Sequence, residues 1–161
     1  MSADTADRTD ATGLETVLLG VGGRDDARID ALVDAVGEIA APCDATVVVA
    51  HVFDKGSYRD AVEQLLDAEG EDIDPDELAS RMTVAREVIE RLERDGIDCE
   101  PRATTGTSGE GIVAIAEEVG ADRVVVGGRR RSPAGKAIFG SVAQEVMLEA
   151  PCPVTFVRNR E

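Results

Sequence analysis

Residues 124–146 read VVVGGRRRSPAGKAIFGSVAQEV and join an apolar run, a basic loop and the start of a helix. Gly127 follows the apolar run directly, and Gly140 and Ser141 stand thirteen residues later at a predicted helix N-terminus. Glycine lets backbone amides approach an anion closely, and helix N-termini favour negative charge. The loop between these glycines carries four cations: Arg129, Arg130, Arg131 and Lys136. The segment therefore predicts a frame that can hold phosphate groups.

The rest of the chain alternates short apolar runs with segments of helical spacing. Strands are predicted at residues 17–21, 45–52, 99–105, 123–126 and 154–157. Helices are predicted from Asp25 to Pro42, from Asp74 to Gly96, from Ser108 to Gly120 and from Gly140 to Pro151. The segment 54–74 is less regular and is read as a short helix or lid followed by a loop.

The helices are expected to bury one apolar stripe each. The inward positions are Ile29, Leu32, Val33, Val36 and Ala40 in the first helix; Leu78, Met82, Ala85, Ile89 and Leu92 in the second; Ile112, Ile115, Ala116 and Val119 in the third; and Val142 and Val146 in the last.

This alternation predicts an α/β fold, a three-layer α/β/α sandwich around a five-stranded parallel sheet. A doubly wound, Rossmann-like strand order of 3-2-1-4-5 makes the first and fourth strands neighbours, and ligands of such sheets bind at the carboxyl ends of the strands flanking that switch point. Those ends are residues 21–23 and 126–128, so a ligand site is expected between them. The last strand, at 154–157, is expected at an edge of the sheet.

The length and the net charge of the chain limit the number of domains and the classes of function. The 161 residues suit one domain, taken as residues 14–161 behind a flexible acidic tail at 1–13. The net charge of −16 is typical of a halophilic protein, and it argues against direct binding to nucleic acid or an anionic membrane. Residues 122–161 carry seven Lys or Arg against four Asp or Glu, so the cations gather in the C-terminal quarter. No signal peptide or membrane span is indicated.

The segment quoted first resembles the phosphate-binding segment of universal stress proteins, whose pattern is G-x2-G-x9-G-[ST]. Gly127, Gly140 and Ser141 match this pattern, and Arg130 stands where the second glycine belongs. The resemblance extends from VLLGVGG through ATVVVAHV to PCPVTFVR, nearly the whole chain apart from residues 55–75. It implies a UspA-like, adenine nucleotide alpha hydrolase-like domain, with a halophilic archaeon as the source that the acidity suggests.

The resemblance also implies a ligand and a partner. The ligand would be ATP or another adenine nucleotide, with Mg²⁺ only if ATP binds, and the nucleotide-binding residues would be Gly20, Gly22, Val52, Val126, Gly127, Arg130, Gly140, Ser141 and Val142. The partner would be a second copy, paired through Val154, Thr155, Phe156 and Val157 of the last strand. A cytoplasmic role in the stress response follows from the same resemblance.

Two departures from the family pattern leave two hypotheses open. Gly22 replaces an aspartate that helps to bind adenosine in family members that bind ATP, and Arg130 could either clamp a phosphate with its planar fork or fill the space that the phosphate needs. The first hypothesis is a nucleotide-responsive stress protein without rapid turnover. The alternative is a nucleotide-free dimeric interaction module of the same fold.

Other chemistries are not supported by motifs. Gly135-Lys136 is followed by Ala137, so the P-loop of an NTPase is absent and at most slow ATP hydrolysis is expected. The acids from Asp72 to Asp76 lack the glycine and glutamate of an EF-hand, and no metal site is predicted. Ser141 has no base placed beside it by any motif, so no catalytic residue is named. The cysteines form no C-x-x-C pair, and His51 is read as a packed structural residue.

Overall fold

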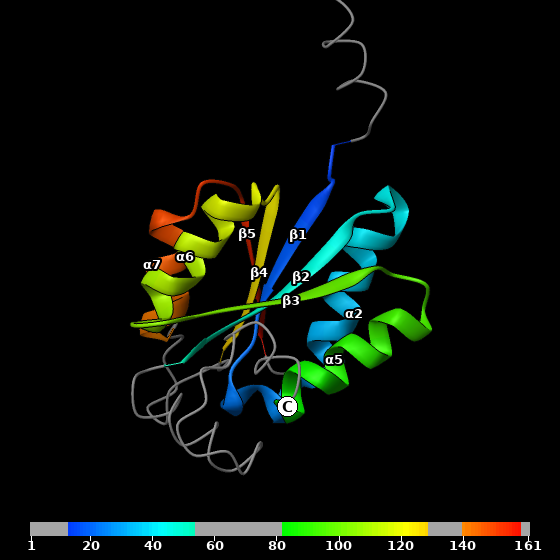
Figure 1. The fold of residues 1–161 in the computed structure, drawn as a ribbon, viewed down its shortest axis with the longest axis horizontal. Coiled ribbons are helices and arrows are strands. Elements are labelled where there is room, and N and C mark those ends of the chain that lie inside the picture. The colour runs from blue at the N-terminus through cyan, green and yellow to red at the C-terminus, as the bar shows by residue number, and fades with distance from the viewer. Residues whose placement is uncertain (1–12, 54–81, 129–139, 159–161) are drawn as a thin grey trace, which may run out of the picture.

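The computed structural model describes residues 13–53, 82–128 and 140–158. These described residues form five strands: β1 (Thr16–Gly20), β2 (Thr46–Phe53), β3 (Cys99–Thr105), β4 (Arg123–Gly128) and β5 (Val154–Arg158). The helices are α2 (Ile29–Ala40), α5 (Thr83–Arg94), α6 (Ser108–Val119) and α7 (Ser141–Glu149), with short 3-10 turns η1 (Gly23–Arg28) and η2 (Ala41–Cys43). Figure 1 shows their arrangement.

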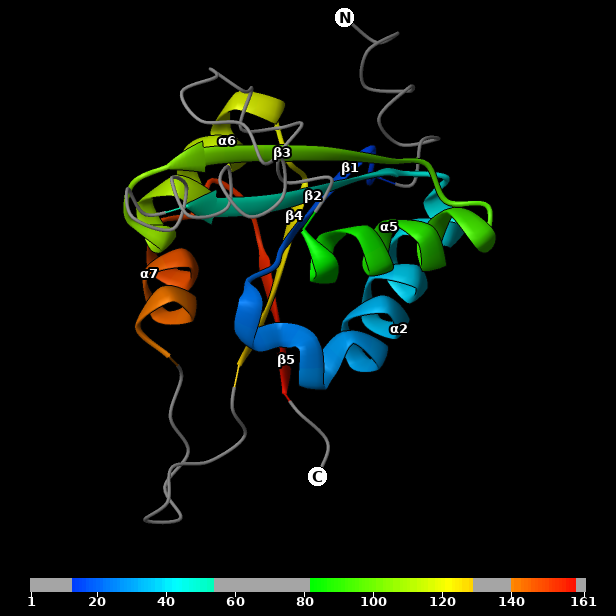
Figure 2. The same ribbon diagram turned by 60° about the horizontal axis from the view of Figure 1, so that its bottom comes forward.

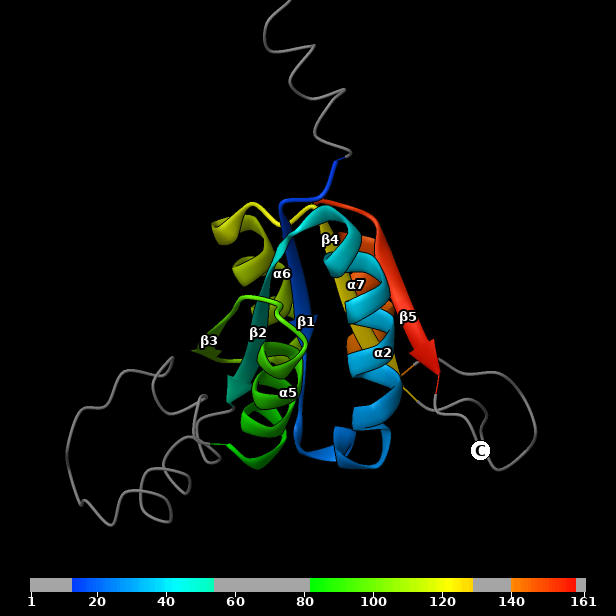
Figure 3. The same ribbon diagram turned by 90° about the vertical axis from the view of Figure 1, so that its right-hand side faces the viewer.

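All described strand pairs are parallel, and the sheet order is β3-β2-β1-β4-β5. The predicted fold class, strand order and switch point between β1 and β4 are therefore confirmed. β1 lies at the centre, where Leu19 pairs with Val49 of β2 and with Val125 of β4. β3 and β5 form the two edges, as Figure 3 shows, so the predicted edge position of the last strand is also correct.

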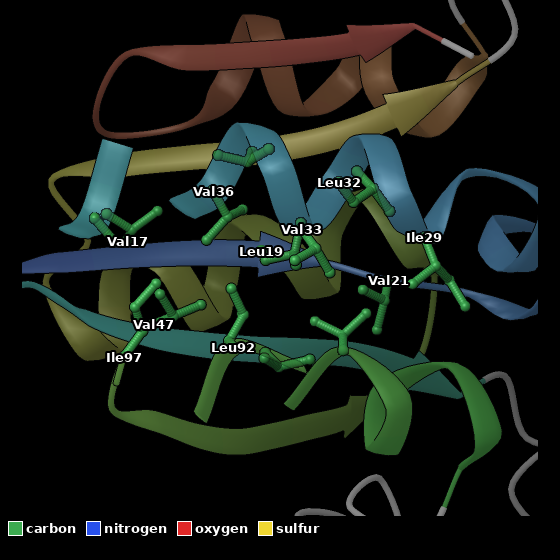
Figure 4. Packing of buried hydrophobic residues seen from close by; sticks show 14 of the residues in the cluster. Val17, Leu19, Val21, Ile29, Leu32, Val33, Val36, Val47, Leu92 and Ile97 are labelled. Carbon is green, nitrogen blue, oxygen red and sulfur yellow. The ribbon is translucent and has the colours of Figure 1, made fainter. Parts of the chain in front are cut away.

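Helices cover both faces of the sheet, α2 and α5 on one side and α6 and α7 on the other (Figures 1 and 2). Alternate residues of β1 pack into the two helix layers, because successive side chains of a strand point to opposite faces of the sheet. Val17 and Leu19 pack under α2 and α5, in the cluster drawn in Figure 4, whereas Leu18 packs under α6. All three are fully buried, so each layer has its own apolar core.

The structure corrects several sequence-based boundaries. α2 buries all five predicted residues but begins at Ile29, after the 3-10 turn η1 rather than at Asp25. β4 extends through Gly127 and Gly128, which pair with Val157 and Arg158. Three predictions lie outside the described residues: the short element at 54–74, residues 1–12 of the acidic tail predicted at 1–13, and the start of the helix predicted from Asp74.

Two helix faces were predicted only in part. Met82 is extended, with φ −69° and ψ 138°, so α5 begins after it. The helix buries Ala85 and Leu92 as predicted, with Val84 and Val88 in addition, while Met82 and Ile89 are partly buried against the same core. In α7 the buried pair is Ala143 and Val146, whereas Val142 is 38% exposed. In contrast, α6 ends as predicted, because Gly120 takes the left-handed conformation (φ 65°) that glycine adopts at little cost.

Candidate functional site

The carboxyl edge of the sheet, at the bottom of Figure 3, carries the loop that follows β1. The Val21 amide donates a hydrogen bond to the Ala50 carbonyl at 2.9 Å, so the chain leaves β1 still tied to β2. Gly22 follows with an extended backbone (φ −143°, ψ 173°), and η1 then runs to the start of α2. The loop therefore lies over the switch point, where a doubly wound sheet binds its ligand.

The carboxylate of Asp25 folds back onto this loop and accepts a hydrogen bond from it. Its Oδ2 accepts a hydrogen bond from the Gly22 amide at 2.7 Å, and the Asp25 amide donates to the Gly22 carbonyl at 3.0 Å. Its Oδ1 pairs with Arg28 at 3.1 Å, and the Asp25 and Arg28 side chains are only 13% and 10% exposed. The mostly buried carboxylate of Asp25 is therefore paired within the turn, with the Gly22 amide and with Arg28.

Arg28 packs against Gly127 of β4, the residue that was expected to contact an anion. A Cβ added at Gly127 would stand 2.8 Å from Arg28 Cδ and 3.2 Å from Leu32 Cδ2, so the bare glycine makes room for both side chains. Arg28 Nε is buried without a hydrogen-bond partner. Gly127 therefore has a packing role that sequence reasoning missed, on the face of the sheet covered by α2.

A pocket of about 280 Å³ opens between the ends of β1 and β2 and the first turn of α5. Its lining residues are Val21, Gly22, His51, Met82, Thr83, Val84 and Ala85. The three residues that begin α5 have amide groups without an intrahelical acceptor, and no side chain among the described residues caps this helix. The lining is thus mainly apolar, with these amides and the imidazole of His51 as its polar groups.

His51 is held in one orientation. Its Nδ1 lies 2.9 Å from the Val21 carbonyl oxygen, and its ring meets Phe53 edge to face at 4.3 Å between centroids. Because a carbonyl only accepts hydrogen bonds, Nδ1 carries the proton, and Nε2 of the neutral ring is an acceptor. Burial lowers the pKa of His51 below 6.5, although the bond to Val21 and the charge of Asp25 oppose this shift. The ring is therefore neutral at pH 7.

This lowered pKa predicts a stability change in mild acid. As pH falls through about 6.5, the unfolded chain takes up a proton on His51 before the folded protein does. The contribution of neutral His51 to the free energy of unfolding is therefore fully present above this pH and is lost as the pH falls below it. We expect the midpoint of urea unfolding to fall between pH 7.5 and 5.5, and to fall less in His51→Phe, which has no group to titrate. An equal decrease in both proteins would contradict this assignment.

The predicted nucleotide-binding residues divide between the two faces of the sheet. Gly22 lines the pocket, but the methyl groups of Val52 pack against Gly111 of α6, on the opposite face from His51. Gly20 and Val126 also face α6, since a Cβ at Gly20 would stand 2.9 Å from Ile112 Cδ1 and 3.3 Å from Val126 Cγ1. Only their backbones can serve a ligand at the carboxyl edge.

The remaining predicted residues lie at or before the start of α7. Gly140 is the residue before the helix, and its carbonyl accepts the Gln144 amide at 2.9 Å. Ser141 and Val142 form the first turn, as predicted, and Arg130 lies outside the described residues. Sequence reasoning missed Asp25, Arg28 and the first turn of α5. The pair Asp25-x-x-Arg28 directly after the first strand was an available signal, because residues three apart meet on a helical turn.

The cysteines do not add a nucleophile to this edge. Cys43, Cys99 and Cys152 form no disulfide with one another. Burial, followed by the charges of Glu93 and Asp98, raises the pKa of Cys99 to about 12. Burial and then Asp122 raise the pKa of Cys152 as well. Protonated thiols are weak nucleophiles, so neither residue suits covalent catalysis at neutral pH.

The described residues contain neither a candidate metal cluster nor a helix that could span a membrane. No three His, Cys, Asp or Glu side chains in this part of the chain gather into a group that could hold a metal ion. Of the helices that the structure describes, none has both the length and the apolar character needed to cross a membrane.

Comparisons with known proteins agree with one another. The model of the universal stress protein family matches residues 13–158. A universal stress protein of Thermus aquaticus is 32% identical over 148 residues, covering 89% of this chain and 98% of the relative. A solved universal stress protein from Archaeoglobus fulgidus superposes with a TM-score of 0.68 at 28% identity, covering 89% of this chain and 98% of the other. A solved universal stress protein in complex with cAMP superposes with a TM-score of 0.64 at 27% identity, covering 92% of this chain and 99% of the other.

Proposed function

Because this chain belongs to the universal stress protein family, we propose that it binds ATP or a related adenine nucleotide, without rapid turnover, at the carboxyl edge of β1 and β4. The pocket beside Gly22 and His51 is the observation that carries this proposal. The related protein that was solved in complex with cAMP supports it. In this view the protein is a nucleotide-responsive component of the stress response in the cytoplasm.

Asp25 can supply the carboxylate that is missing at Gly22, the first departure from the family pattern. Gly22 cannot supply the carboxylate that the family resemblance leads one to expect, but Asp25 Oδ2 lies 2.7 Å from the Gly22 amide. We therefore assign to Asp25 the role that Gly22 has lost.

This assignment predicts different effects from two acidic residues. Asp25→Ala is expected to weaken the binding of AMP by about tenfold, as the loss of one charge-assisted hydrogen bond implies. Asp30→Ala removes the same charge from α2, where its side chain is 85% exposed and pairs with Arg91, and should leave the affinity unchanged. The measurement is isothermal titration calorimetry in concentrated KCl with AMP, cAMP, and ATP with and without Mg²⁺.

Two results of this titration are decisive once a melting curve shows that Asp25→Ala is folded. The curve is needed because the variant removes the carboxylate that pairs with the mostly buried Arg28 side chain. Equal affinities for Asp25→Ala and Asp30→Ala would refute the role of Asp25. Absence of heat with every nucleotide would refute nucleotide binding by the wild-type protein.

A second candidate function rests on Arg28. Its side chain and Leu32 already fill the space above Gly127, which leaves less room for a phosphate at this glycine than the family pattern implies. This observation favours a nucleotide-free dimeric module that acts through partners. Such a dimer would form through β5, because the other edge strand, β3, contains Pro101, which has no amide proton to share. Native mass spectrometry that finds stoichiometric nucleotide in the gently purified protein would exclude this candidate.

A further inference from the structure

We propose that Arg28 binds the phosphate group of the nucleotide, and that Asp25 holds the guanidinium in place for this contact. Arg28 lies outside the glycine pattern from which phosphate binding was expected, in the turn that follows β1. This inference rests on the proposed function, because it concerns how the same edge of the sheet recognises one part of its ligand.

Arg28 reaches across the switch point of the sheet. It is the last residue of η1, which lies at the carboxyl edge between β1 and α2 (Figure 3). Its side chain extends to β4, where its Cδ atom lies 2.8 Å from the position that a Cβ of Gly127 would take. Gly127 is the first residue of the pattern that was expected to hold phosphate. Arg28 therefore brings a cation to the end of β4 from the loop after β1, and these are the two strands that flank the switch point.

Asp25 fixes the position of this cation. Its Oδ1 pairs with Nη1 of Arg28 at 3.1 Å, and its Oδ2 accepts the Gly22 amide at 2.7 Å, so one carboxylate ties the arginine to the loop after β1. The two side chains are only 10% and 13% exposed. Salt screens a buried pair much less than an exposed one, so Arg28 remains an oriented cation even in concentrated KCl.

One donor of this arginine has no partner. Nε of Arg28 is buried and forms no hydrogen bond within the part of the chain that the structure describes. A buried N–H without an acceptor costs free energy, so a ligand oxygen that satisfies it gains affinity. Because Nε is covered in this structure, we expect the guanidinium to turn when a phosphate binds, with the pair to Asp25 as the pivot.

The chemistry of the side chain favours a clamp over a plug. The planar fork of a guanidinium matches the oxygens of a phosphate group and can donate two parallel hydrogen bonds to it. An aliphatic side chain could fill the space above Gly127 as well as Arg28 does, without burying a charge and an unpaired donor. The buried charge and its unpaired N–H are therefore explained by an anionic ligand rather than by packing.

The test compares AMP with adenosine, which share the base and the sugar and differ in the phosphate. Calorimetry in concentrated KCl is expected to show that Arg28→Gln weakens AMP binding by about tenfold or more and leaves adenosine binding unchanged. Glutamine keeps the side-chain carbons as far as Cδ, the atom that packs on Gly127, but lacks the charge and the fork. Arg94→Gln is the matched control, because Arg94 is exposed in the last turn of α5, and it should keep both affinities.

Two further measurements separate phosphate contact from support of the fold. Arg28→Lys keeps the charge but not the fork, so its affinity for AMP should lie between those of the wild type and Arg28→Gln. Phosphorus NMR of bound AMP, followed against pH, reports the second pKa of the phosphate, which a neighbouring cation lowers. This pKa should rise toward that of free AMP in Arg28→Gln and stay unchanged in Arg94→Gln. A merely structural arginine would change the melting temperature without moving this pKa.

The outcomes distinguish this inference from the function on which it rests. Tighter AMP binding by Arg28→Gln would mean that the side chain fills the space of the phosphate. An unchanged affinity for AMP, or an equal loss for AMP and adenosine, would mean that Arg28 does not contact the phosphate. Each of these results would overturn this inference and leave nucleotide binding intact. Absence of binding of adenosine, AMP and ATP by the wild-type protein would overturn the proposed function, and this inference with it.

Discussion

Replacing Leu32 by alanine is expected to lower the free energy of unfolding by about 2–5 kcal/mol, the usual cost of truncating a fully buried leucine. Leu32 is 0% exposed and points from α2 into the cluster shown in Figure 4. Its Cδ2 atom also lies 3.2 Å from the position that a Cβ of Gly127 would take, so it packs directly under the candidate site. The cavity would remove support from both α2 and β4.

Urea unfolding in concentrated KCl, followed by circular dichroism, measures this loss. Leu148→Ala is the matched control, because the same atoms are removed from a side chain that is 75% exposed in α7. The control should change the free energy of unfolding by less than about 0.5 kcal/mol. A Leu32→Ala variant as stable as Leu148→Ala would show that α2 does not pack on the sheet as described.

The sheet could be predicted from sequence because its strands are short, apolar and separated by clear helical signals. Residues 45–52 contain an almost continuous apolar run, and such a run is buried on both faces of a parallel sheet. Right-handed crossovers then leave few strand orders to consider. Predicted ends differ from the observed ones by a residue or two, as in β1, which ends at Gly20 rather than Val21.

Helix faces were less predictable where two apolar stripes compete. In α5 the stripe through Met82 and Ile89 and the stripe through Val84 and Val88 both have helical spacing. The capping signal at Asp74 favoured the first. The observed helix begins after Met82 and buries the second stripe fully, while Met82 and Ile89 pack partly buried against the same core. In α7 the small side chain of Ala143 is buried in place of Val142, a choice that depends on how closely α7 approaches its neighbours.

Sequence reasoning expected a ligand site at the carboxyl ends of β1 and β4. The pocket that the structure describes opens between β1, β2 and α5, and of its lining residues only Gly22 was among the predicted site residues. The contact of Arg28 with Gly127 joins residues far apart in the chain, and the bond of His51 to Val21 depends on the pairing of β1 with β2. Such contacts require the register of the sheet and the path of η1, and neither is encoded in a local motif. The return of Asp25 to Gly22 was the exception, because it spans only three residues.

Glycines in two helices provide the last prediction, since the same substitution should have opposite effects. A Cβ at Gly37 in α2 would meet Ile97 Cδ1 at 4.0 Å, an ordinary contact. A Cβ at Gly111 in α6 would stand 2.5 and 2.8 Å from the two methyl carbons of Val52 and 3.0 Å from Thr104 Cγ2. Gly37→Ala is therefore expected to raise the free energy of unfolding by about 0.5–1 kcal/mol, and Gly111→Ala to lower it by about 1–3 kcal/mol.

The opposite signs follow from the rigidity of the neighbours. Alanine favours helix equally at both positions, so intrinsic propensity cancels in the comparison. Val52 is β-branched, with a restricted side-chain torsion, and it lies in β2 next to His51, so it cannot turn away without moving the end of the strand. Urea unfolding of both variants measures the difference. A stabilising Gly111→Ala would mean that α6 stands farther from β2 than described, and that Val52 is free to reorient toward the carboxyl edge.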